Sequence, residues 1–523
     1  MIQIDERTKS VVLQAVDPLG LRELLPKSKM LAHPDFNFAA KHDLQTTLLL
    51  RNMGYQVPSP IRYQYGWPGK FIPFDHQIAM AEFWSMHRRA FNLSEAGTGK
   101  TNGVLWAADY LMGQGQVDSA LVVAPLSTIR TIWMQDIFDT LMHRRAVVVH
   151  GTRDQRREAL RSPADFYLLN HDGVKILEIM RMIRDNPTIN LVVIDEGDEF
   201  RNHDTAKYKA LVAMLRPDMR IWWQTGTPIP NNPTDAWAQA RIINPEGTPK
   251  WFGAFKRETM MQLTPFKWAP KKGSNERAFQ LLQPAIRFKK RDCLDLPDVV
   301  TTSRQAQLTD AQRAAFATMK NDMIMENAEV QARGGHIAAV HAADQIGKLR
   351  QILCGCVKEP KTENYVEIPH QPRIYTLMEC IRSASAKVIV IVPFKGITES
   401  LAAELRKHYS VGLLNGDVSA NKRHETVQAF KHTPDPHILL CHPKVMSHGL
   451  NLTEADTTIF YAPIYSNSQY QQVIERFNRA GQVNKMTVYK IAAHPMEWEI
   501  YRQTELAIAN QESILSLYSS LLQ

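Results

Sequence analysis

Short apolar runs separated by helix-like stretches occupy residues 71–248. Each run ends at a polar or glycine-bearing segment, as a buried strand does where it reaches a loop. The runs are ALVVAPL, RAVVVHG, FYLLNHD, NLVVIDE and IWWQTGT. Strands of this kind with helices between them predict a parallel, doubly wound sheet. Such sheets bind ligands at the carboxyl ends of their strands, which is where the polar residues fall.

A second set of apolar runs predicts another α/β lobe over residues 371–523. These runs are KVIVIVP, VGLLNG, HILLCH, TTIFYA and MTVYKI. Between the two lobes, residues 249–370 are predicted to form a basic and helical connector, with an alanine-rich helical pattern broken at Arg333–His336. Residues 1–70 carry no chemical motif and are treated as an N-terminal segment of unknown role. The fold class is therefore α/β, with two doubly wound parallel-sheet lobes.

Composition narrows the class of protein. A chain of 523 residues is too long for one core, and 44% hydrophobic with 22% charged residues is typical of soluble globular proteins. The formal net charge of +9 suits a polyanionic partner, although solubility alone also tolerates it. Five cysteines without framework spacing indicate a reducing compartment. The first residues do not resemble a signal peptide, and no run reaches membrane-span length. We expect a cytoplasmic protein without a membrane partner.

The segment SEAGTGKT, Ser94 to Thr101, predicts a phosphate-binding loop. Its backbone amides can surround the β- and γ-phosphates of a nucleotide, because glycine lets the backbone come close. Lys100 would reach the phosphates, and the Thr101 hydroxyl would ligate Mg²⁺. Ser94 occupies the first glycine position of the G-x-x-x-x-G-K-[ST] pattern, so the match is incomplete. The predicted ATP-binding residues here are Gly97, Thr98, Gly99, Lys100 and Thr101.

A carboxylate pair follows another predicted strand, in LVVIDEGDEF. Asp195 would hold Mg²⁺, and Glu196 would orient or deprotonate the attacking water. The alternative is a solvated acidic loop after a buried strand. Upstream, Gln77 in FIPFDHQ can donate to and accept from an adenine edge at once. A packed surface glutamine is the ordinary alternative at that position.

The segment QQVIERFNRAGQ sets Arg476 and Arg479 three residues apart. On a helix these two side chains share one face, so both guanidinium groups would point the same way. A surface ion-pair ladder is the more common explanation of such a pair when the segment is taken alone.

The order of these segments resembles a superfamily-two helicase, and more narrowly a Swi/Snf-type DNA translocase. The resemblance runs from about residue 70 to 505 and places both lobes in the RecA-like class. Departures are Ser94 for the family's Asp, Ala96 for its Met, and DEGD for its D-E-A-H. The segments that carry it are FIPFDHQ, SEAGTGKT, APLSTIRTIW, DEGD, QTGTPIPNN, IRFKKRDCLDLP, LTDAQRAAF, KLRQILCG, LLNGDVSANKR, SHGLNLTEAD and QQVIERFNRAGQ.

The resemblance implies roles for further residues. It makes Arg476 and Arg479 arginine fingers that face the γ-phosphate, beside Lys100 and Glu196 as catalytic residues. Contacts to DNA would go mostly to phosphates, with little base specificity. The implied coupling residues are Thr225, Gly226, Thr227 and Gly449. The implied DNA-binding residues are Pro125, Leu126, Ser127, Gly416, His448 and Asn451.

The predicted function is a nucleic-acid-stimulated ATPase that acts as an ATP-dependent DNA translocase or helicase and uses ATP and Mg²⁺. So small a motor is similar to bacterial or phage members of the family, which places it in a bacterial or phage-infected host cytoplasm. Two alternatives stay open. One is an RNA-directed superfamily-two helicase, and the other is the motor subunit of a larger nuclease or replication or repair assembly. A non-hydrolysing nucleic-acid-binding relative is disfavoured because the catalytic residues are retained.

Overall fold

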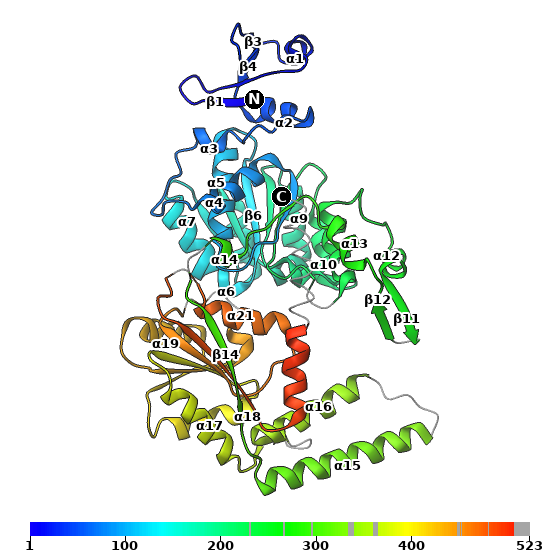
Figure 1. Cartoon of the computed structure of the whole chain (residues 1–523), viewed down its shortest axis with the longest axis vertical. Coiled ribbons are helices and arrows are strands. Elements are labelled where there is room, and N and C mark those ends of the chain that lie inside the picture. Colours follow the sequence, from blue (N-terminus) through cyan, green and yellow to red (C-terminus); the bar gives the residue numbers. More distant parts are fainter. Residues whose placement is uncertain are drawn as a thin grey trace. The chain divides into compact units, whose positions relative to one another are not determined.

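The computed structural model describes residues 1–229, 232–264, 267–293, 296–332, 339–358, 365–446, 450, 452–479 and 481–506. The chain divides into two compact units, the first running from Met1 to Cys293 and the second beginning at Leu294 (Figure 1). Among the described residues, no helix is both long and apolar enough to cross a membrane.

The chain begins with a small antiparallel sheet of its own. Its strand order is β1-β2-β4-β3, and its core is made by apolar residues such as Val11, Leu13 and Phe38, all fully buried. The elements are β1 (Ile2–Asp5), β2 (Ser10–Leu13), α1 (Pro18–Leu24), β3 (Lys29–Met30), β4 (Phe38–Lys41) and α2 (Leu44–Asn52), followed by α3 (Ile61–Gln64). Residues 1–60 thus contain a folded module for which the sequence showed no motif.

A seven-stranded parallel sheet forms the centre of the first unit. The order is β13-β5-β10-β9-β6-β8-β7, and every neighbouring pair is parallel. The strands are β5 (Arg89–Asn92), β6 (Ser119–Ala124), β7 (Ala146–Val149), β8 (Phe166–Asn170), β9 (Ile189–Ile194), β10 (Arg220–Gln224) and β13 (Ala285–Ile286). All their carboxyl ends therefore meet at one edge, which positions the loops described below.

Helices cover both faces of this sheet because its strands are apolar on both sides. In β6, Ala120 and Val122 belong to one core cluster, and Leu121 and Val123 belong to the other, as the alternation of strand side chains requires. The first cluster includes α4 (Asp75–Met86), α5 (Lys100–Gly113) and α7 (Met134–Thr140). The second includes α8 (Arg153–Arg161), α9 (Leu177–Asp185), α10 (Ala206–Met214), α11 (Ala236–Ile243) and α13 (Ser274–Leu281).

Further short elements complete the first unit. A separate hairpin of β11 (Met260–Thr264) and β12 (Lys267–Pro270) follows α12 (Phe252–Thr259). The remaining turns and helices are α6 (Leu126–Thr128), the π-helical η1 (Ile129–Trp133), η2 (His171–Lys175), η3 (Gly197–Phe200), η4 (Pro233–Asp235) and α14 (Lys290–Cys293).

The second unit has a six-stranded parallel sheet of the order β14-β21-β20-β17-β19-β18. Its strands are β14 (Val299–Gln305), β17 (Lys387–Ile391), β18 (Val411–Leu414), β19 (Ile438–Cys441), β20 (Ala455–Phe460) and β21 (Met486–Ala492). One face packs on α17 (Gln371–Arg382) and α18 (Lys395–Leu405). The other packs on α19 (Ala420–His432) and α21 (Asn467–Phe477).

The remaining elements of the second unit surround this sheet. They are α15 (Asp310–Ala332), α16 (Ala339–Cys354), β15 (Cys356–Lys358), β16 (Tyr365–Glu367), α20 (Pro443–Met446) and a final helix over residues 495–506.

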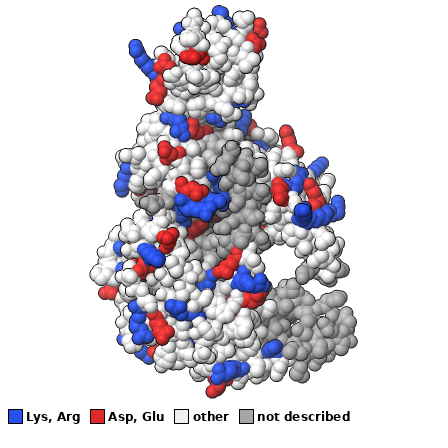
Figure 2. Space-filling model, viewed as in Figure 1, with Lys and Arg blue, Asp and Glu red and all other residues white. Residues whose placement is uncertain are grey.

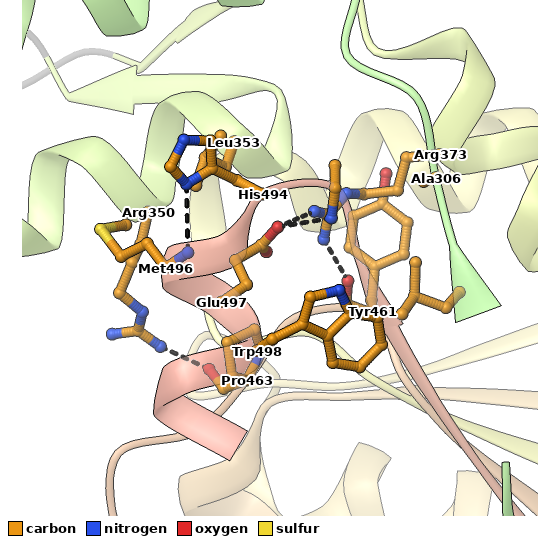
Figure 3. A network of polar contacts seen from close by, with 12 residues as sticks. Ala306, Arg350, Leu353, Arg373, Tyr461, Pro463, His494, Met496, Glu497 and Trp498 are labelled. Carbon is orange, nitrogen blue, oxygen red and sulfur yellow. Dashed lines mark hydrogen bonds and ion pairs between the residues drawn. The ribbon is translucent and has the colours of Figure 1, made fainter. Parts of the chain in front are cut away.

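A buried polar network fastens several of these elements together (Figure 3). The Arg373 guanidinium of α17 pairs with Glu497 of the final helix at 2.5 Å, and each side chain is 1% exposed. Arg373 also donates to the Tyr461 carbonyl oxygen at 2.6 Å. From α16, Arg350 donates to the Pro463 carbonyl oxygen at 2.5 Å. Segments far apart in the chain are thus held by buried charged groups as well as by apolar packing.

Two doubly wound parallel α/β lobes were predicted, and the structure confirms them. All ten predicted apolar runs contain a strand, and the helical pattern near 305–355 forms α15 and α16 on either side of the predicted break, whose residues 333–338 lie outside the described residues. The predicted connector, 249–370, is shared between the units. Its strand β13 joins the first sheet, and its strand β14 joins the second.

Candidate nucleotide-binding site

The phosphate loop follows β5 and leads into α5, as predicted. Gly99 precedes the helix with a φ of 73°, a left-handed conformation that favours glycine. A Cβ on Gly99 would lie 1.9 Å from Gln77 Nε2, so a larger residue does not fit there. The Lys100 ammonium donates to the Ser94 carbonyl oxygen at 2.7 Å and so lies across the loop. The other predicted binding residues, Gly97, Thr98 and Thr101, lie in the same loop and the first turn of α5.

The first turn of α4 rests against this loop. Gln77 accepts from the Phe74 backbone N–H at 3.0 Å through Oε1, which leaves its amide nitrogen over Gly99. The neighbouring His76 Nε2 lies 2.9 Å from the Thr98 carbonyl oxygen. Because a carbonyl only accepts, Nε2 carries the hydrogen, and burial lowers the His76 pKa so that the ring is neutral near pH 7. The sequence indicated Gln77 but gave no signal for His76.

The basic segment IRFKKRD docks onto the same loop. The backbone N–H of Phe288 donates to Ser94 Oγ at 2.9 Å, and that of Lys290 donates to Glu95 Oε2 at 2.8 Å. Glu95 returns a backbone bond to the Phe288 carbonyl at 3.1 Å. Ser94 stands where the resembling family has aspartate, and its hydroxyl supplies the acceptor that this contact needs. The departure from the family pattern therefore keeps an acceptor in place.

Asp195 follows β9, and each of its two carboxylate oxygens accepts a hydrogen bond. Its Oδ2 accepts from the Trp133 indole at 2.9 Å, and its Oδ1 accepts from the Glu196 backbone N–H at 3.1 Å. Burial raises the Asp195 pKa, while the bond from Trp133 and the charge of Lys100 act in the opposite direction. Behind it, His171 Nε2 donates to the Asp195 carbonyl oxygen at 2.8 Å, and burial lowers the His171 pKa to about 4.

The two residues after Asp195 occupy restricted positions, Glu196 because of its backbone conformation and Gly197 because of a neighbouring side chain. Glu196 adopts a φ of 48°, a conformation that non-glycine residues rarely take outside functional or strained sites. A Cβ on Gly197 would lie 2.0 Å from Trp223 Nε1. The alanine of the D-E-A-H pattern would therefore collide with this indole, which explains why DEGD carries glycine at its third position.

The last residue of DEGD contacts the predicted coupling segment. Thr225 Oγ1 lies 3.5 Å from Asp198 Oδ1, and the Thr227 backbone N–H donates to Thr225 Oγ1 at 3.0 Å. Burial raises the Asp198 pKa to about 7. Asp198 thus links the acid box to the strand end of β10 through a carboxylate, at the position where the D-E-A-H pattern has histidine.

The coupling segment also touches the phosphate loop. A Cβ on Gly226 would lie 3.6 Å from the Ala96 backbone nitrogen and 3.7 Å from the Ser94 carbonyl oxygen. Gln224 Nε2 donates to the Lys100 carbonyl oxygen at 3.2 Å. Three loops at the carboxyl edge of one sheet, after β5, β9 and β10, are therefore connected to one another by direct contacts.

The predicted DNA-binding segment of the first unit follows β6 at this same edge. Pro125 precedes α6, Leu126 is 50% exposed, and the Ser127 hydroxyl oxygen is buried with no hydrogen-bond partner within the described residues. The π-helical turn η1 comes next and ends at Trp133, whose indole is the group bonded to Asp195. Sequence reasoning missed Trp133, although it closes the APLSTIRTIW segment.

The two arginines lie in the second unit, and their predicted geometry is wrong. Helix α21 ends at Phe477, so Arg479 lies beyond it and does not share a helical face with Arg476. Arg476 Nε donates to the Met446 carbonyl oxygen at 2.9 Å, and an Arg479 nitrogen donates to the Leu450 carbonyl oxygen at 3.2 Å. Arg476 is thus bonded to the end of α20, and Arg479 to one described residue of the SHGLNLTEAD motif.

Gly416 is exposed directly after β18. The turn around it is fixed by Asn415, whose side-chain oxygen accepts from the backbone N–H groups two and three residues further on, at 3.0 and 3.1 Å. The remaining predicted residues of this lobe, His448, Gly449 and Asn451, lie outside the described residues.

Comparisons with known proteins agree on one family. Residues 80–362 match the SNF2-related domain, and residues 372–481 match the helicase conserved C-terminal domain. The chain is 25% identical over 422 residues to putative protein p41 of Acyrthosiphon pisum secondary endosymbiont phage 1, which covers 76% of this chain and 87% of the phage protein.

Two longer helicases are also similar. An uncharacterized ATP-dependent helicase of Mycoplasma genitalium is 24% identical over 76% of this chain and 37% of its own length. The ATP-dependent DNA helicase DDM1 of Arabidopsis thaliana is 24% identical over 79% of this chain and 57% of its own. The chain thus spans much less than the full length of these two relatives.

Among solved structures, the Sulfolobus solfataricus SWI2/SNF2 ATPase core in complex with dsDNA is 21% identical, with a TM-score of 0.42, over 83% of this chain and 91% of that chain. The SNF2-related match alone covers more than half of the residues, and the segments that carry it include the phosphate loop, the acid box and the coupling segment described above. This chain belongs to the SNF2-related family.

Proposed function

We propose that this chain is a nucleic-acid-stimulated ATPase that translocates along DNA. The observation that carries the proposal is the gathering of Lys100, Asp195 and Gly226 by loops that touch one another at the carboxyl edge of one parallel sheet. Open α/β sheets bind ligands at this edge. Membership of the SNF2-related family supports the same activity.

The donor set fits a nucleotide with its metal ion. A glycine-rich loop at the start of α5 offers backbone N–H groups to phosphates, and Gly99 takes the left-handed conformation that glycine adopts readily. Lys100 supplies a charge for the phosphates, while the Thr101 hydroxyl and the Asp195 carboxylate are oxygen ligands of the kind that Mg²⁺ prefers. A bound Mg²⁺ would neutralise charge on the phosphate oxygens. Glu196 would orient the attacking water or accept its proton.

DNA would be held mainly through its phosphates. In the first unit the proposed contacts are Pro125, Leu126 and Ser127, and in the second they are Gly416, His448 and Asn451. Trp133 joins the first group to Asp195 through one short helical turn. This gives a short covalent and hydrogen-bonded route by which occupancy of the DNA segment can influence the metal ligand.

Two alternatives differ in the partner. An RNA-directed superfamily-two helicase would have the same ATP site, and no residue described here excludes it. A motor subunit of a larger nuclease or replication or repair assembly would have the same activity and a protein partner besides. The similarity to a phage protein supports placing the motor in a bacterial or phage-infected cytoplasm.

The test compares ATP hydrolysis with single-stranded DNA, duplex DNA, forked DNA and RNA, side by side. We expect DNA to stimulate the rate more than RNA. Glu196→Gln should lower kcat by roughly 10²–10⁴-fold, the contribution of a general base, while ATP still binds. Glu199→Gln is the matched control, because Glu199 lies in the same acidic segment and pairs with Lys207 at 3.0 Å. Stimulation by RNA with DNA inert would favour the RNA-helicase alternative, and wild-type turnover in Glu196→Gln would contradict its assignment.

A further inference from the structure

The hairpin of β11 and β12 stands apart from the rest of the first unit. Within the described residues these strands pair with each other and with no further strand, and the ribbon shows them projecting beyond α12 (Figure 1). A two-stranded hairpin is marginally stable by itself, but the base of this one is fastened. Phe255 is fully buried, Thr259 Oγ1 donates to its carbonyl at 2.8 Å, and the Lys271 backbone N–H donates to the Thr259 carbonyl at 2.9 Å.

The projecting part exposes apolar side chains. In β11, Met260 is buried and the four residues that follow are exposed. Met261 and Leu263 are each 50% exposed, and Leu263 lies at an irregularity of the strand, because the pairing register shifts between Gln262 and Thr264. Trp251, directly before α12, is 70% exposed. These side chains contribute little to the core, so the fold alone does not account for them.

The base of the hairpin is strongly basic. Residues 250–277 contain seven lysines and arginines and two glutamates, and one of these, Glu258, is paired with Arg277 at 2.7 Å. Lys250, Arg257, Lys271 and Lys272 are exposed. Lysine and arginine side chains gather on this side of the unit in the space-filling view (Figure 2). An apolar projection therefore rises from a positively charged base.

We propose that residues 250–264 and 267–277, named here the basic hairpin, bind nucleic acid in which unpaired bases adjoin a duplex. Cationic side chains attract phosphates wherever the backbone passes, whereas exposed apolar and aromatic side chains gain contact only with bases that are unstacked or splayed out. The two features together fit a junction better than a continuous duplex. The inference rests on the proposed function in taking DNA as the ligand.

Other anionic surfaces share part of this chemistry. An anionic membrane would also attract lysines and accept Met261 and Leu263 into its interface. DNA is favoured because the basic hairpin belongs to the unit that holds the phosphate loop, and because basic residues dominate 246–292, the stretch that also carries the segment docked on that loop.

The experiment measures equilibrium binding of the full chain without nucleotide, by fluorescence anisotropy, to single-stranded, duplex and forked DNA of equal length. Met261→Ser with Leu263→Ser should weaken binding to the fork about tenfold, the lower range for loss of base contacts, and leave the affinity for duplex DNA nearly unchanged. Lys271→Gln with Lys272→Gln should weaken binding to all three and reduce the salt dependence by up to about two charges. Lys29→Gln with Lys209→Gln, exposed lysines outside the basic hairpin, is the control of equal charge.

Three outcomes would overturn the inference. The first is that the serine variant binds forked and duplex DNA as the wild type does while its thermal unfolding is unchanged. The second is that the lysine control matches the hairpin lysine variant. The third is binding of the wild type to phosphatidylserine-containing vesicles that the serine variant loses while its DNA binding stays intact. The binding assay contains no ATP, so it reports the fork preference whether or not DNA stimulates hydrolysis. Failure of the proposed function would instead appear in the ATPase assay, so the two failures can be distinguished.

Discussion

At the scale of single residues, the contact between Trp133 and Asp195 gives the site a feature that its motifs do not describe. The Trp133 ring is fully buried, and its indole N–H donates to a carboxylate oxygen at 2.9 Å. A hydrogen bond to the ionised form favours that form, which offsets the effect of burial on the Asp195 pKa. Trp133 is therefore a positioning residue that keeps the proposed metal ligand charged and oriented.

Trp133→Phe should raise the Mg²⁺ concentration required for ATP hydrolysis. An aromatic ring is kept, although a smaller one, and one hydrogen bond to a charged group is lost, at a cost of about 1.5–3 kcal/mol, which corresponds to roughly tenfold or more in an equilibrium constant. Trp106→Phe is the matched control, because Trp106 is equally buried and donates to the Pro68 carbonyl at 3.0 Å, away from the acid box. Mg²⁺ titrations of hydrolysis for both variants make the comparison. Equal Mg²⁺ requirements would reduce Trp133 to a core residue.

Local sequence patterns predicted the residues of this site that lie in recognisable motifs. They missed the residues that act only through contacts with distant parts of the chain. Lys100 and Asp195 are signalled by their immediate neighbours, a glycine-rich loop and an apolar strand. Trp133 and His171 act through contacts with Asp195 across 62 and 24 residues, and nothing adjacent to them in the sequence reports the contact. The glycine of DEGD is explained only once Trp223 is seen beside it.

At the scale of elements, the end of α21 decides how the two arginines act. The helical spacing of Arg476 and Arg479 predicted a shared face, but the backbone leaves the helix at Asn478, with φ −88° and ψ 79°. Arg476 is 5% exposed and donates to the Met446 carbonyl oxygen. Each arginine can therefore serve as an arginine finger toward the nucleotide, or as a clamp that holds the chain at Met446 or Leu450 in place. Loss of the finger lowers kcat, whereas loss of the clamp lowers stability.

Arg476→Ala and Arg479→Ala should each lower DNA-stimulated kcat by about 10³-fold or more, the contribution of an arginine finger, while the dissociation constants for ATP and DNA change little. Lysine should not restore turnover, because it lacks the planar fork of donors. The measurements are kcat, both dissociation constants and the thermal midpoint for each variant. A lowered midpoint with unchanged kcat would assign the arginines to the clamp alone.

In the two parallel sheets, strand prediction succeeded where the strands are long and apolar and failed where they are short or polar. The strands missed there, β5, β13 and β14, read RAFN, AI and VVTTSRQ. They are too short or too polar to stand out as buried runs, and β14 is largely exposed because it lies at the edge of its sheet. Their positions follow from pairing with distant strands, which periodicity along the chain does not reveal.

The buried pair of Arg373 and Glu497 should dominate the stability of the second unit. Glu497→Gln leaves the Arg373 charge buried without its counter-charge, which should cost about 3–5 kcal/mol. Replacing both residues, as Arg373→Met with Glu497→Leu, should cost less than either single change, since no lone charge stays buried. The pair Arg502 and Glu499, exposed on the final helix at 2.6 Å, is the control and should contribute at most about 1 kcal/mol. Thermal unfolding of Glu497→Gln, Arg373→Met, Glu497→Leu, the double variant and the control Glu499→Gln tests this order, and an additive double variant would contradict it.

At the scale of the whole molecule, the positive charge is unevenly distributed along the chain. Residues 246–292 contain eleven lysines and arginines and four acidic residues, against a net charge of +9 for all 523 residues. Most of the excess charge therefore lies in this one stretch, part of which is docked on the phosphate loop. The positive charge that would attract a polyanion and the candidate ATP site thus lie in one unit. Salt should weaken DNA binding much more than it affects the ATP site.

DNA-stimulated hydrolysis at limiting DNA should fall steeply as salt rises, whereas hydrolysis without DNA should change little. Phosphate contacts release counterions, so the logarithm of DNA affinity falls with the logarithm of salt by about 0.9 per contact. The contacts that order Lys100, Asp195 and Thr225 are buried or backbone-bonded and are screened much less. The measurement is ATPase rate between about 50 and 200 mM salt, with DNA absent, limiting and saturating. If saturating DNA restores the full rate at high salt, salt acts on DNA binding, as predicted. An equal decline in all three series would place the effect of salt on the ATP site and contradict the assignment of the excess charge to DNA.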